Sequence, residues 1–442
     1  MLKKRVAIIG AGPTGMFLAR AFKLAADKDP SILDHFEIVC FERQAEWGGL
    51  WNFTWRTGLD ENGEPVHASM YRNLWSNSPK ECVDIPSYMP RDVMCDYLNG
   101  RMFASNIKHW FRFKHSVQSV TYDDTTKKFS VTVWNTADDH IFTEEFDYIT
   151  VATGHFSTPN VPYYPGFDTF SGRIIHSHDF RDAREFTNLN VLVIGNAYSA
   201  EDIAVQCWKF GSKSVTISYK TKPTGHQWPE GIDERPILEK LDGRKAYFKD
   251  GSIKDEVDSV ILCTGYLHSF PFMETSLRLK TDNCVWIEGL YKGVAFEKNT
   301  KLFYIGMQDQ VYSFPMFDVQ AYYVRDVILG RIILPSLERM RQYYNEWQER
   351  GAKFRETSDV REKILFQSAY IKELMNDTNY PKFDIDAMNE IFFGWQEDRK
   401  LGIMDFRNYT YKSAISGIES AKPKKKWIYE MNDSLYEFLK DE

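Results

Sequence analysis

The chain has 442 residues, so a single hydrophobic core is not expected and the length predicts two or more domains. Hydrophobic residues make up 43% and charged residues 26%, which excludes wholesale disorder, and a net charge of −7 disfavours a general nucleic-acid binder. No stretch reaches about 18 consecutive apolar residues, and the N-terminal apolar run is too short for a signal peptide. The six scattered cysteines form no CxxC pair, which favours a reduced, cytoplasmic protein over a disulfide reductase, and we predict no metal site.

The N-terminus has the order of a dinucleotide-binding unit. "RVAIIGAGPTG" predicts a buried strand over Arg5–Ile9 followed by GxGxxG, and "TGMFLARAFKLAAD" continues with helical spacing. Gly10 permits the tight turn, Gly12 admits a pyrophosphate, and Gly15 lets the helix approach the strand. The next predicted strand, "FEIVCFE", ends at Glu42, whose carboxylate can accept hydrogen bonds from ribose hydroxyls. A chance glycine turn is the weaker interpretation because all the parts follow in order.

The segment "FRFKHSVQSVTYDDTTKKFSVTVW" alternates apolar and polar residues and carries a turn at Asp123–Thr126. This pattern predicts a β meander on the first domain. A buried β run, "YITVATG", follows and closes in a turn at Thr153–Gly154. The next segment, "FSGRIIHSHDF", contains two histidines and two phenylalanines, and its local pattern indicates neither a clean helix nor a clean strand.

A second strand, turn and helix occur in "NVLVIGNAYSAEDIA". Val191–Ile194 is strand-like and Gly195 opens the turn, but the pattern is GxAxxA, so a methyl group at Ala197 crowds a pyrophosphate slightly. The side chains of Tyr198 and Ser199 offer polar groups in exchange. This signal, taken alone, is weaker than the first.

The strand that follows the second turn, "SVTISYK", ends in a cation. Lys220 stands there, with Lys222 nearby, where a site for NAD would carry an acid. A cation suits the ribose 2′-phosphate of NADP. The alternative is a pair of solvated lysines at a strand end.

A further buried run, "VILCTGY", closes in a glycine turn at Thr264–Tyr266. Together with "YITVATG" it brackets the second unit, so we interpret the two runs as crossings between domains. Two dinucleotides on one chain imply an electron relay, for which FAD and NADPH are the economical pair. The sequence thus predicts an α/β fold of two Rossmann-like domains, with an NADPH domain at 160–270 inserted between the two parts of an FAD domain, 1–159 and 271–442.

The segment 330–442 shows helical patterns such as "SLERMRQYYNEWQERGAKF" and contains no catalytic motif. We therefore predict a helical C-terminal tail in the second part of the FAD domain. "KPKKKW" at 422–427 could contact acidic lipid or a partner, and a solvated loop is the interpretation we favour.

"FSGRIIHSHDF" resembles the fingerprint of flavin-containing monooxygenases, FxGxxxHxxx(F/Y), through Phe170, Gly172, His176 and Phe180. Baeyer–Villiger monooxygenases have a similar string with Trp in place of Phe180. The strings "FDYITVATGHFSTPNVP", "SAEDIAVQC" and "LFYIGMQDQ" are similar to the bacterial trimethylamine monooxygenase branch, and the similarity extends over nearly the whole chain. We expect the fingerprint histidines to be structural, in a linker that sets the angle between the domains.

The resemblance implies that NADPH reduces FAD and that reduced flavin captures dioxygen as a C4a-hydroperoxyflavin. This species would transfer its distal oxygen to a tertiary amine, trimethylamine first, or to a sulfide. Two alternatives stay open: Baeyer–Villiger or indole-type carbon oxygenation, and an uncoupled NADPH oxidase or redox flavoprotein. The partners implied are the small substrate and O2, with no nucleic acid or membrane, and a homodimer is expected by analogy with the family.

The resemblance also implies roles for individual residues. The FAD-binding residues would be Gly10, Gly12, Gly15, Glu42, Gln44, Leu50, Trp51, His67, Asn77, Val117 and Gln308, and the NADP-binding residues Trp75, Gly195, Tyr198, Ser199 and Lys220. Asn77 and Tyr198 would be catalytic, Asn77 beside flavin N5 and C4a and Tyr198 beside retained NADP+. An amide suits this place because it donates a hydrogen bond yet neither titrates nor destroys a peroxide. Without the resemblance, Asn77 would be an ordinary turn residue before Pro79.

The sequence departs from the family pattern in three places. The connection in "KECVDIPSYMPRD", about residues 81–90, is shorter, which alters the region near the substrate entrance. Val311 stands where Trp is frequent, so the seal over the flavin is expected to be looser and hydrogen peroxide release higher. Lys220 stands where Arg is common, and this change removes bidentate pairing with the 2′-phosphate.

Overall fold

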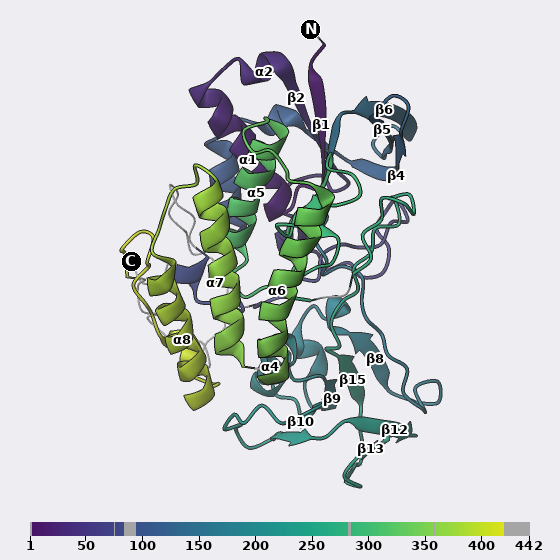
Figure 1. Cartoon of the computed structure of the whole chain (residues 1–442). Helices are drawn as coiled ribbons and strands as arrows, with labels where there is room; N and C mark the ends of the chain where they lie inside the picture. The colour runs from purple at the N-terminus through teal and green to yellow at the C-terminus, as the bar shows by residue number, and fades with distance from the viewer. Residues whose placement is uncertain (1, 75, 84–93, 282–283, 358, 420–442) are drawn as a thin grey trace, which may run out of the picture.

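The computed structural model describes residues 2–74, 76–83, 94–281, 284–357 and 359–419. In Figure 1 the N-terminal strands lie at the top, a second group of strands lies at the bottom, and the C-terminal helices run along one side between them. Within the described residues the strands form four sheets, two of them large.

The larger sheet has seven strands. In sheet order they are β16 (Leu290–Tyr291), β17 (Ala295–Phe296), β18 (Leu302–Tyr304), β7 (Tyr148–Val151), β1 (Lys4–Ile9), β2 (Phe36–Glu42) and β3 (Phe111–Phe113). β18, β7, β1, β2 and β3 are parallel neighbours, and β1 is apolar and fully buried over its last four residues. Such continuous apolar runs are typical of parallel strands covered on both faces.

The second large sheet has five strands, all parallel. In sheet order they are β11 (Ile232–Arg235), β10 (Ser214–Ser218), β9 (Asn190–Ile194), β15 (Ser259–Leu262) and β8 (Arg173–His176). All its strands lie between β7 and β18 in sequence, although β7 and β18 are paired neighbours in the larger sheet. This order is what the predicted insertion requires.

Two antiparallel sheets complete the strands. The predicted meander is confirmed for β4 (His115–Asp123) and β5 (Lys128–Asn135), with the turn closed by the Lys127 N–H donating to the Asp123 carbonyl at 2.8 Å. β6 (His140–Phe146) completes this sheet, whereas Phe111–Phe113 at the start of the predicted stretch is strand β3 of the larger sheet. The other sheet consists of β12 (Leu238–Asp242), β13 (Lys245–Phe248) and β14 (Ile253–Lys254).

Helices cover the sheets and form the C-terminal part. The helices of the described chain are α1 (Pro13–Lys28), α2 (Ile32–His35), α3 (Met94–Phe103), α4 (Tyr198–Lys209), α5 (Phe314–Ile328), α6 (Leu337–Thr357), α7 (Val360–Asp377) and α8 (Ile385–Leu401). Short 3₁₀ turns are η1 (Gly49–Trp51), η2 (Lys80–Cys82), η3 (Lys108–Trp110), η4 (Ser177–Asp179), η5 (Ala183–Phe186) and η6 (Phe406–Asn408). The predicted helical tail is confirmed over α6, α7 and α8. No helix in the described ranges combines the length and the apolar character needed to cross a bilayer.

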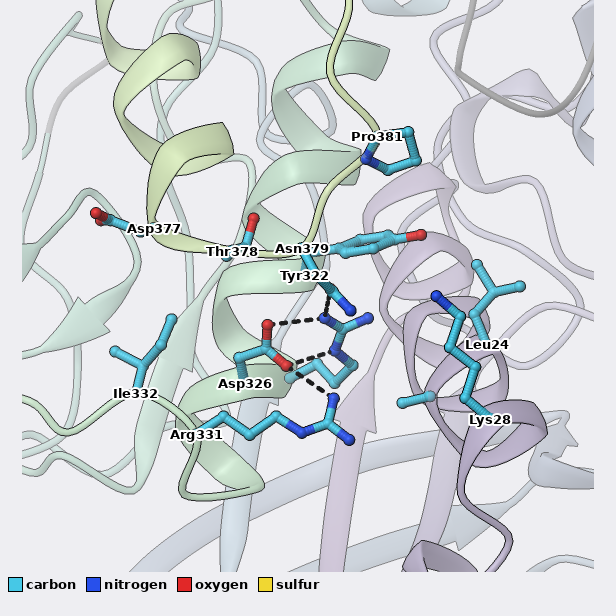
Figure 2. Close-up of a pocket in the computed structure, with 12 residues that line it drawn as sticks. Leu24, Lys28, Tyr322, Asp326, Arg331, Ile332, Asp377, Thr378, Asn379 and Pro381 are labelled. Atoms are coloured by element: carbon cyan, nitrogen blue, oxygen red, sulfur yellow. Dashed lines mark hydrogen bonds and ion pairs between the residues drawn. The ribbon is translucent and has the colours of Figure 1, made fainter.

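α1 and α5 pack together beneath the larger sheet, with the rings of Phe17 and Phe314 edge to face at 5.6 Å. A cavity of about 390 Å³ lies where the C-terminal ends of α1, α5 and α7 meet (Figure 2). Buried Arg325 lines the cavity, pairing with Asp326 and reaching Asn379 beyond α7. A helix of the length of α1 is about 24 Å long, so this cavity lies far from Gly12 at the other end of the helix.

Candidate active site

The first glycine turn joins the carboxyl end of β1 to α1. Gly10 has φ +103°, and a Cβ there would lie 2.7 Å from the Ala152 carbonyl oxygen, so only glycine fits. A Cβ at Gly15 would lie 2.0 Å from the Gly10 oxygen, which explains how closely the helix approaches the strand. Gly12 is the N-cap of α1 and provides no side-chain cap, so the first N–H groups of the helix are available to a ligand.

Glu42 lies at the end of β2, beside this turn. One carboxylate oxygen accepts the Ala11 N–H at 2.6 Å and the other accepts the Gln44 N–H at 2.8 Å. Burial raises the pKa of Glu42, and these two backbone hydrogen bonds counteract the rise. Each oxygen keeps a lone pair, so the carboxylate can still accept from a ribose hydroxyl.

The segment after β2 folds back over the glycine turn. Gly48 donates its N–H to the Ala11 carbonyl at 2.9 Å, and a Cβ at Gly49 would lie 2.9 Å from the Gly12 Cα. Leu50 and Trp51 follow in η1, and both are partly buried. The Gln44 amide nitrogen donates weakly to the Gly49 carbonyl at 3.4 Å. The structure therefore brings Gln44, Leu50 and Trp51 next to the turn.

Val117 and His67 flank the same region. Lys114, just before β4, donates its N–H to the Gln44 carbonyl at 3.0 Å, so β4 begins beside Gln44, and Val117 stands at a β-bulge in this strand. Burial, with Arg43 and His178 nearby, lowers the pKa of His67 to about 3. The His67 ring is therefore neutral at physiological pH.

Gln308 follows β18, whose carboxyl end lies next to those of β7 and β1. It is buried, its amide nitrogen donates to the Gly293 carbonyl at 2.9 Å, and its oxygen accepts from Gln320 at 3.1 Å. Gln320 also accepts the Gly306 N–H at 2.9 Å and so fastens this strand end to α5. The Gln308 amide also hydrogen-bonds the Tyr370 hydroxyl, and its contact with a flavin remains a prediction.

The fingerprint stretch runs through β8 and η4. His176 Nδ1 accepts the His178 N–H at 3.0 Å, as expected of a structural histidine, and Phe180 is fully buried against Tyr71, with ring centroids 5.2 Å apart. Buried Arg181 donates to the carbonyls of His178 at 2.6 Å and of Ala68 at 3.0 Å. These bonds tie the start of the second sheet to the segment that carries His67.

The second turn follows β9 at the carboxyl edge of the five-stranded sheet. Gly195 has φ +114°, and a Cβ there would lie 2.3 Å from the Cys263 carbonyl oxygen at the end of β15. Ala197 is the N-cap of α4 without a side-chain cap, and Tyr198 and Ser199 begin the helix, both partly exposed. The turn thus presents uncapped N–H groups at the edge where open α/β sheets bind ligands.

β10 ends at Ser218, two residues before the predicted end at Lys220. Lys220 and Lys222 are exposed, and the Asn196 amide donates to the Lys222 carbonyl at 2.9 Å. The second turn therefore holds the lysine segment beside it. In this position the exposed Lys220 side chain lies near the second turn, and its contact with a phosphate remains a prediction.

Asn77 lies in an exposed turn between Ser76 and Ser78, whose hydroxyls are 3.2 Å apart. No hydrogen bond joins its amide to another described residue, so the group is available to a ligand. Trp75, predicted to hold NADP, lies outside the described residues, as does most of the shortened connection. No three or more His, Cys, Asp and Glu side chains among the described residues are arranged to hold a metal. Free thiols are found at Cys40, Cys82, Cys207, Cys263 and Cys284.

Both turns fit the diphosphate of a dinucleotide, because each combines a left-handed glycine, an uncapped helix start and a parallel strand edge. A family model described as flavin-binding monooxygenase-like matches residues 3–224 and 231–403. The chain belongs to this family. The predicted class of enzyme, a flavin monooxygenase, is confirmed.

This monooxygenase is 50% identical over 453 aligned positions to the trimethylamine monooxygenase of Roseovarius nubinhibens, with 100% of both chains covered. It is 49% identical to the trimethylamine monooxygenase of Methylocella silvestris, with 98% of each covered. The crystal structure of Tmm from a Pelagibacter species matches with a TM-score of 0.93 at 46% identity, covering 98% of this chain and 100% of that one. The predicted fold of two Rossmann-like units is also confirmed.

The C-terminal helices of this monooxygenase contact Tyr198 and the turn after Gln308, which the sequence interpretation missed. The Gln396 amide of α8 donates to the Tyr198 hydroxyl at 2.8 Å, and Arg399 Cζ lies 4.4 Å from the Tyr198 ring centroid. Gln367 of α7 accepts the Val311 N–H at 2.7 Å and so holds the turn after Gln308. No local motif marks these residues, because their helices show only ordinary amphipathic spacing.

Proposed function

We propose that this monooxygenase holds FAD at the first glycine turn and NADPH at the second, and converts trimethylamine to trimethylamine N-oxide. The observation that carries the proposal is full-length identity of 46–50% to trimethylamine monooxygenases, combined with two separate dinucleotide turns on one chain. Other small tertiary amines and sulfides belong to the same substrate class, since each offers a soft lone pair.

The proposed reaction consumes NADPH, a proton, O2 and trimethylamine and yields NADP+, water and the N-oxide. When bound, FAD takes up the hydride and activates dioxygen, chemistry that no protein side chain can supply. The uncapped amides of α1 would hold its diphosphate and Glu42 its ribose. The amide of Asn77 would donate one hydrogen bond beside the flavin without titrating.

The finer features belong to the same proposal. The free cysteines favour a cytoplasmic location, and a homodimer is proposed by analogy with the family. We also propose domain boundaries at residues 159/160 and 270/271, because all strands of the five-stranded sheet fall between them. Lys220 would meet the 2′-phosphate of NADPH as a point charge rather than as a bidentate partner.

Carbon oxygenation is not favoured, since relatives that are 46–50% identical are trimethylamine monooxygenases and the fingerprint ends in Phe180 rather than Trp. The second alternative is an uncoupled NADPH oxidase, which the hydrogen peroxide assay described below tests. Val311 motivates it, because a valine covers less surface than the tryptophan frequent at this position.

The test is to purify the protein, record its visible spectrum, and follow NADPH loss with and without trimethylamine while quantifying N-oxide and hydrogen peroxide. We expect a flavin spectrum, amine-stimulated oxidation and close to one N-oxide per NADPH. A ketone assayed in parallel tests for carbon oxygenation, which would convert the ketone to an ester or a lactone. Unchanged NADPH loss with stoichiometric hydrogen peroxide would reject trimethylamine as substrate.

A further inference from the structure

Two pairs of side chains face each other between α4 and α8. Tyr198 and Glu201 stand three residues apart on α4, and Gln396 and Arg399 stand three residues apart on α8, so each pair shares a helix face. Gln396 contacts the Tyr198 hydroxyl, and Arg399 Nε donates to Glu201 at 3.0 Å. The two helices are therefore joined at two successive positions, the first of which involves Tyr198, the residue that begins α4 directly after the second turn.

The orientation of the Gln396 amide follows from chemistry. Arg399 Nη1 lies 3.1 Å from the Gln396 oxygen, and a guanidinium can only donate hydrogen bonds. The amide oxygen must therefore face Arg399, and the amide nitrogen faces Tyr198. Arg399 is itself held by the Glu201 carboxylate, whose other oxygen lies 3.2 Å from His226 Nε2.

Tyr198 is consequently the acceptor in its bond with Gln396, and its own O–H proton is not used there. No described residue accepts that proton. Burial raises the pKa of Tyr198, although Arg399 and Gln396 oppose the rise, so the hydroxyl is protonated at neutral pH. Tyr198 is the first residue of α4, directly after the second turn, so we infer that this proton serves a ligand bound at the turn.

We propose that Gln396 and Arg399 are positioning residues that hold the Tyr198 hydroxyl as a hydrogen-bond donor toward the bound nicotinamide nucleotide. The inference rests on the proposed function, since it takes NADP(H) as the ligand of the second turn. It assigns a site role to the C-terminal helix, which contains no recognised motif. In this arrangement Arg399 orients Gln396, and Gln396 orients Tyr198.

Gln396→Glu is the informative substitution because it keeps the shape and replaces the donor by an acceptor. The introduced carboxylate would accept the Tyr198 proton and withdraw it from the second turn. We expect the dissociation constant for NADP+, measured calorimetrically on the FAD-loaded protein, to rise about three- to tenfold, as for the loss of one hydrogen bond. Tyr198→Phe should raise it by a similar factor.

The double variant decides between positioning and a general structural effect. In the Tyr198→Phe background, Gln396→Glu should change NADP+ affinity by less than about twofold, because no proton is left to withdraw. Gln396→Met, which cannot accept the proton, should weaken binding less than Gln396→Glu. Gln342→Glu, on the exposed face of α6, is the matched control and should bind NADP+ like the wild type.

Wild-type affinity in Gln396→Glu, or an equal loss in both backgrounds, would overturn the proposal. The thermal midpoint of each variant is measured alongside, so that weaker binding through misfolding is recognised, and Gln396→Met then serves in place of a misfolded variant. Binding of NADP+ requires no amine. A wild type that binds NADP+ but forms no N-oxide would therefore reject the proposed substrate while leaving the positioning role open to the same test.

Discussion

Glu42 shows how one side chain can serve both the fold and a ligand. Each carboxylate oxygen accepts a backbone N–H, from Ala11 and from Gln44, and these bonds hold the glycine turn against the start of the next segment. A buried carboxylate is tolerated because these donors compensate for its desolvation. The same geometry leaves each oxygen a lone pair, which we propose accepts from a ribose hydroxyl.

Glu42→Gln is expected to reduce FAD content strongly and to destabilise the apoprotein by about 1–3 kcal/mol. The cause is that the new amide NH2 faces a backbone N–H, so one buried donor loses its acceptor. The ratio of flavin absorbance to protein absorbance after purification measures the first effect, and urea unfolding the second.

Glu37→Gln provides the control on the same strand, because Glu37 lies near the other end of β2 in a partly exposed pair with Arg5. It should retain flavin like the wild type. Normal FAD content in Glu42→Gln would contradict the assignment of the first turn to FAD.

At the scale of elements, charged side chains join helices that are distant in sequence. Arg325, near the end of α5, donates to the Asp326 carboxylate from Nε at 2.9 Å and from Nη2 at 2.8 Å. Its Nη2 also donates to the Asn379 side-chain oxygen at 2.6 Å. Arg331 adds a longer contact to Asp326 at 3.3 Å (Figure 2). The ends of α5 and α7 are thereby held together beside α1, and this junction supports the helices that reach the second turn.

Arg325→Met should lower the free energy of unfolding by about 3 kcal/mol or more, because it leaves the buried Asp326 carboxylate with only the weaker contact to Arg331. Adding Asp326→Asn should recover part of the loss, since no charge is then left unpaired. Urea unfolding of the three proteins measures both effects.

The control is Arg339→Met on α6, whose pair with Glu346 is half exposed on both sides. We expect a change below about 1 kcal/mol for it. Equal effects of Arg325→Met and Arg339→Met would contradict the role of the buried pair.

At the scale of the whole molecule, neutral imidazoles gather where the two large sheets meet. Burial, with His268 nearby, lowers the pKa of His155 to about 3, and burial lowers the pKa of His176 to about 4. His67, at about 3, belongs to the same group. Unfolded histidines titrate at about 6.5, so below that pH the unfolded chain binds more protons than the folded protein.

The protein is therefore expected to lose stability as the pH falls from about 7 toward 4. Each of these imidazoles should contribute a loss of about 2 kcal/mol between pH 7 and 5. His155→Phe keeps an aromatic ring but cannot be protonated, so its loss over this interval should be smaller by about that amount.

Urea unfolding at several pH values measures the difference, with His140→Gln on the exposed meander as the control for replacing a histidine. If the wild type and His155→Phe lose stability equally between pH 7 and 5, His155 does not become protonated on unfolding as proposed.

Local patterns were sufficient for the elements that carry the glycine turns. The predicted strand "FEIVCFE" coincides with β2, and the alternation in 111–134 corresponds to the meander. The strand before Lys220 was predicted two residues too long, because its last residues continue the apolar and polar pattern beyond the hydrogen-bonded ladder. Strand ends depend on neighbouring strands, which local sequence does not show.

The sequence by itself determined the two dinucleotide turns, since steric limits at Gly10, Gly15 and Gly195 act over a few residues. Only the tertiary structure decided that α8 lies against α4. Gln396 and Tyr198 meet across 198 positions of chain, and such a contact leaves no periodicity at either end. This contact forms because α4 of the second unit and α8 of the C-terminal part pack together in the folded chain. The partner of a helix face therefore depends on the tertiary structure and not on the local sequence of the helix.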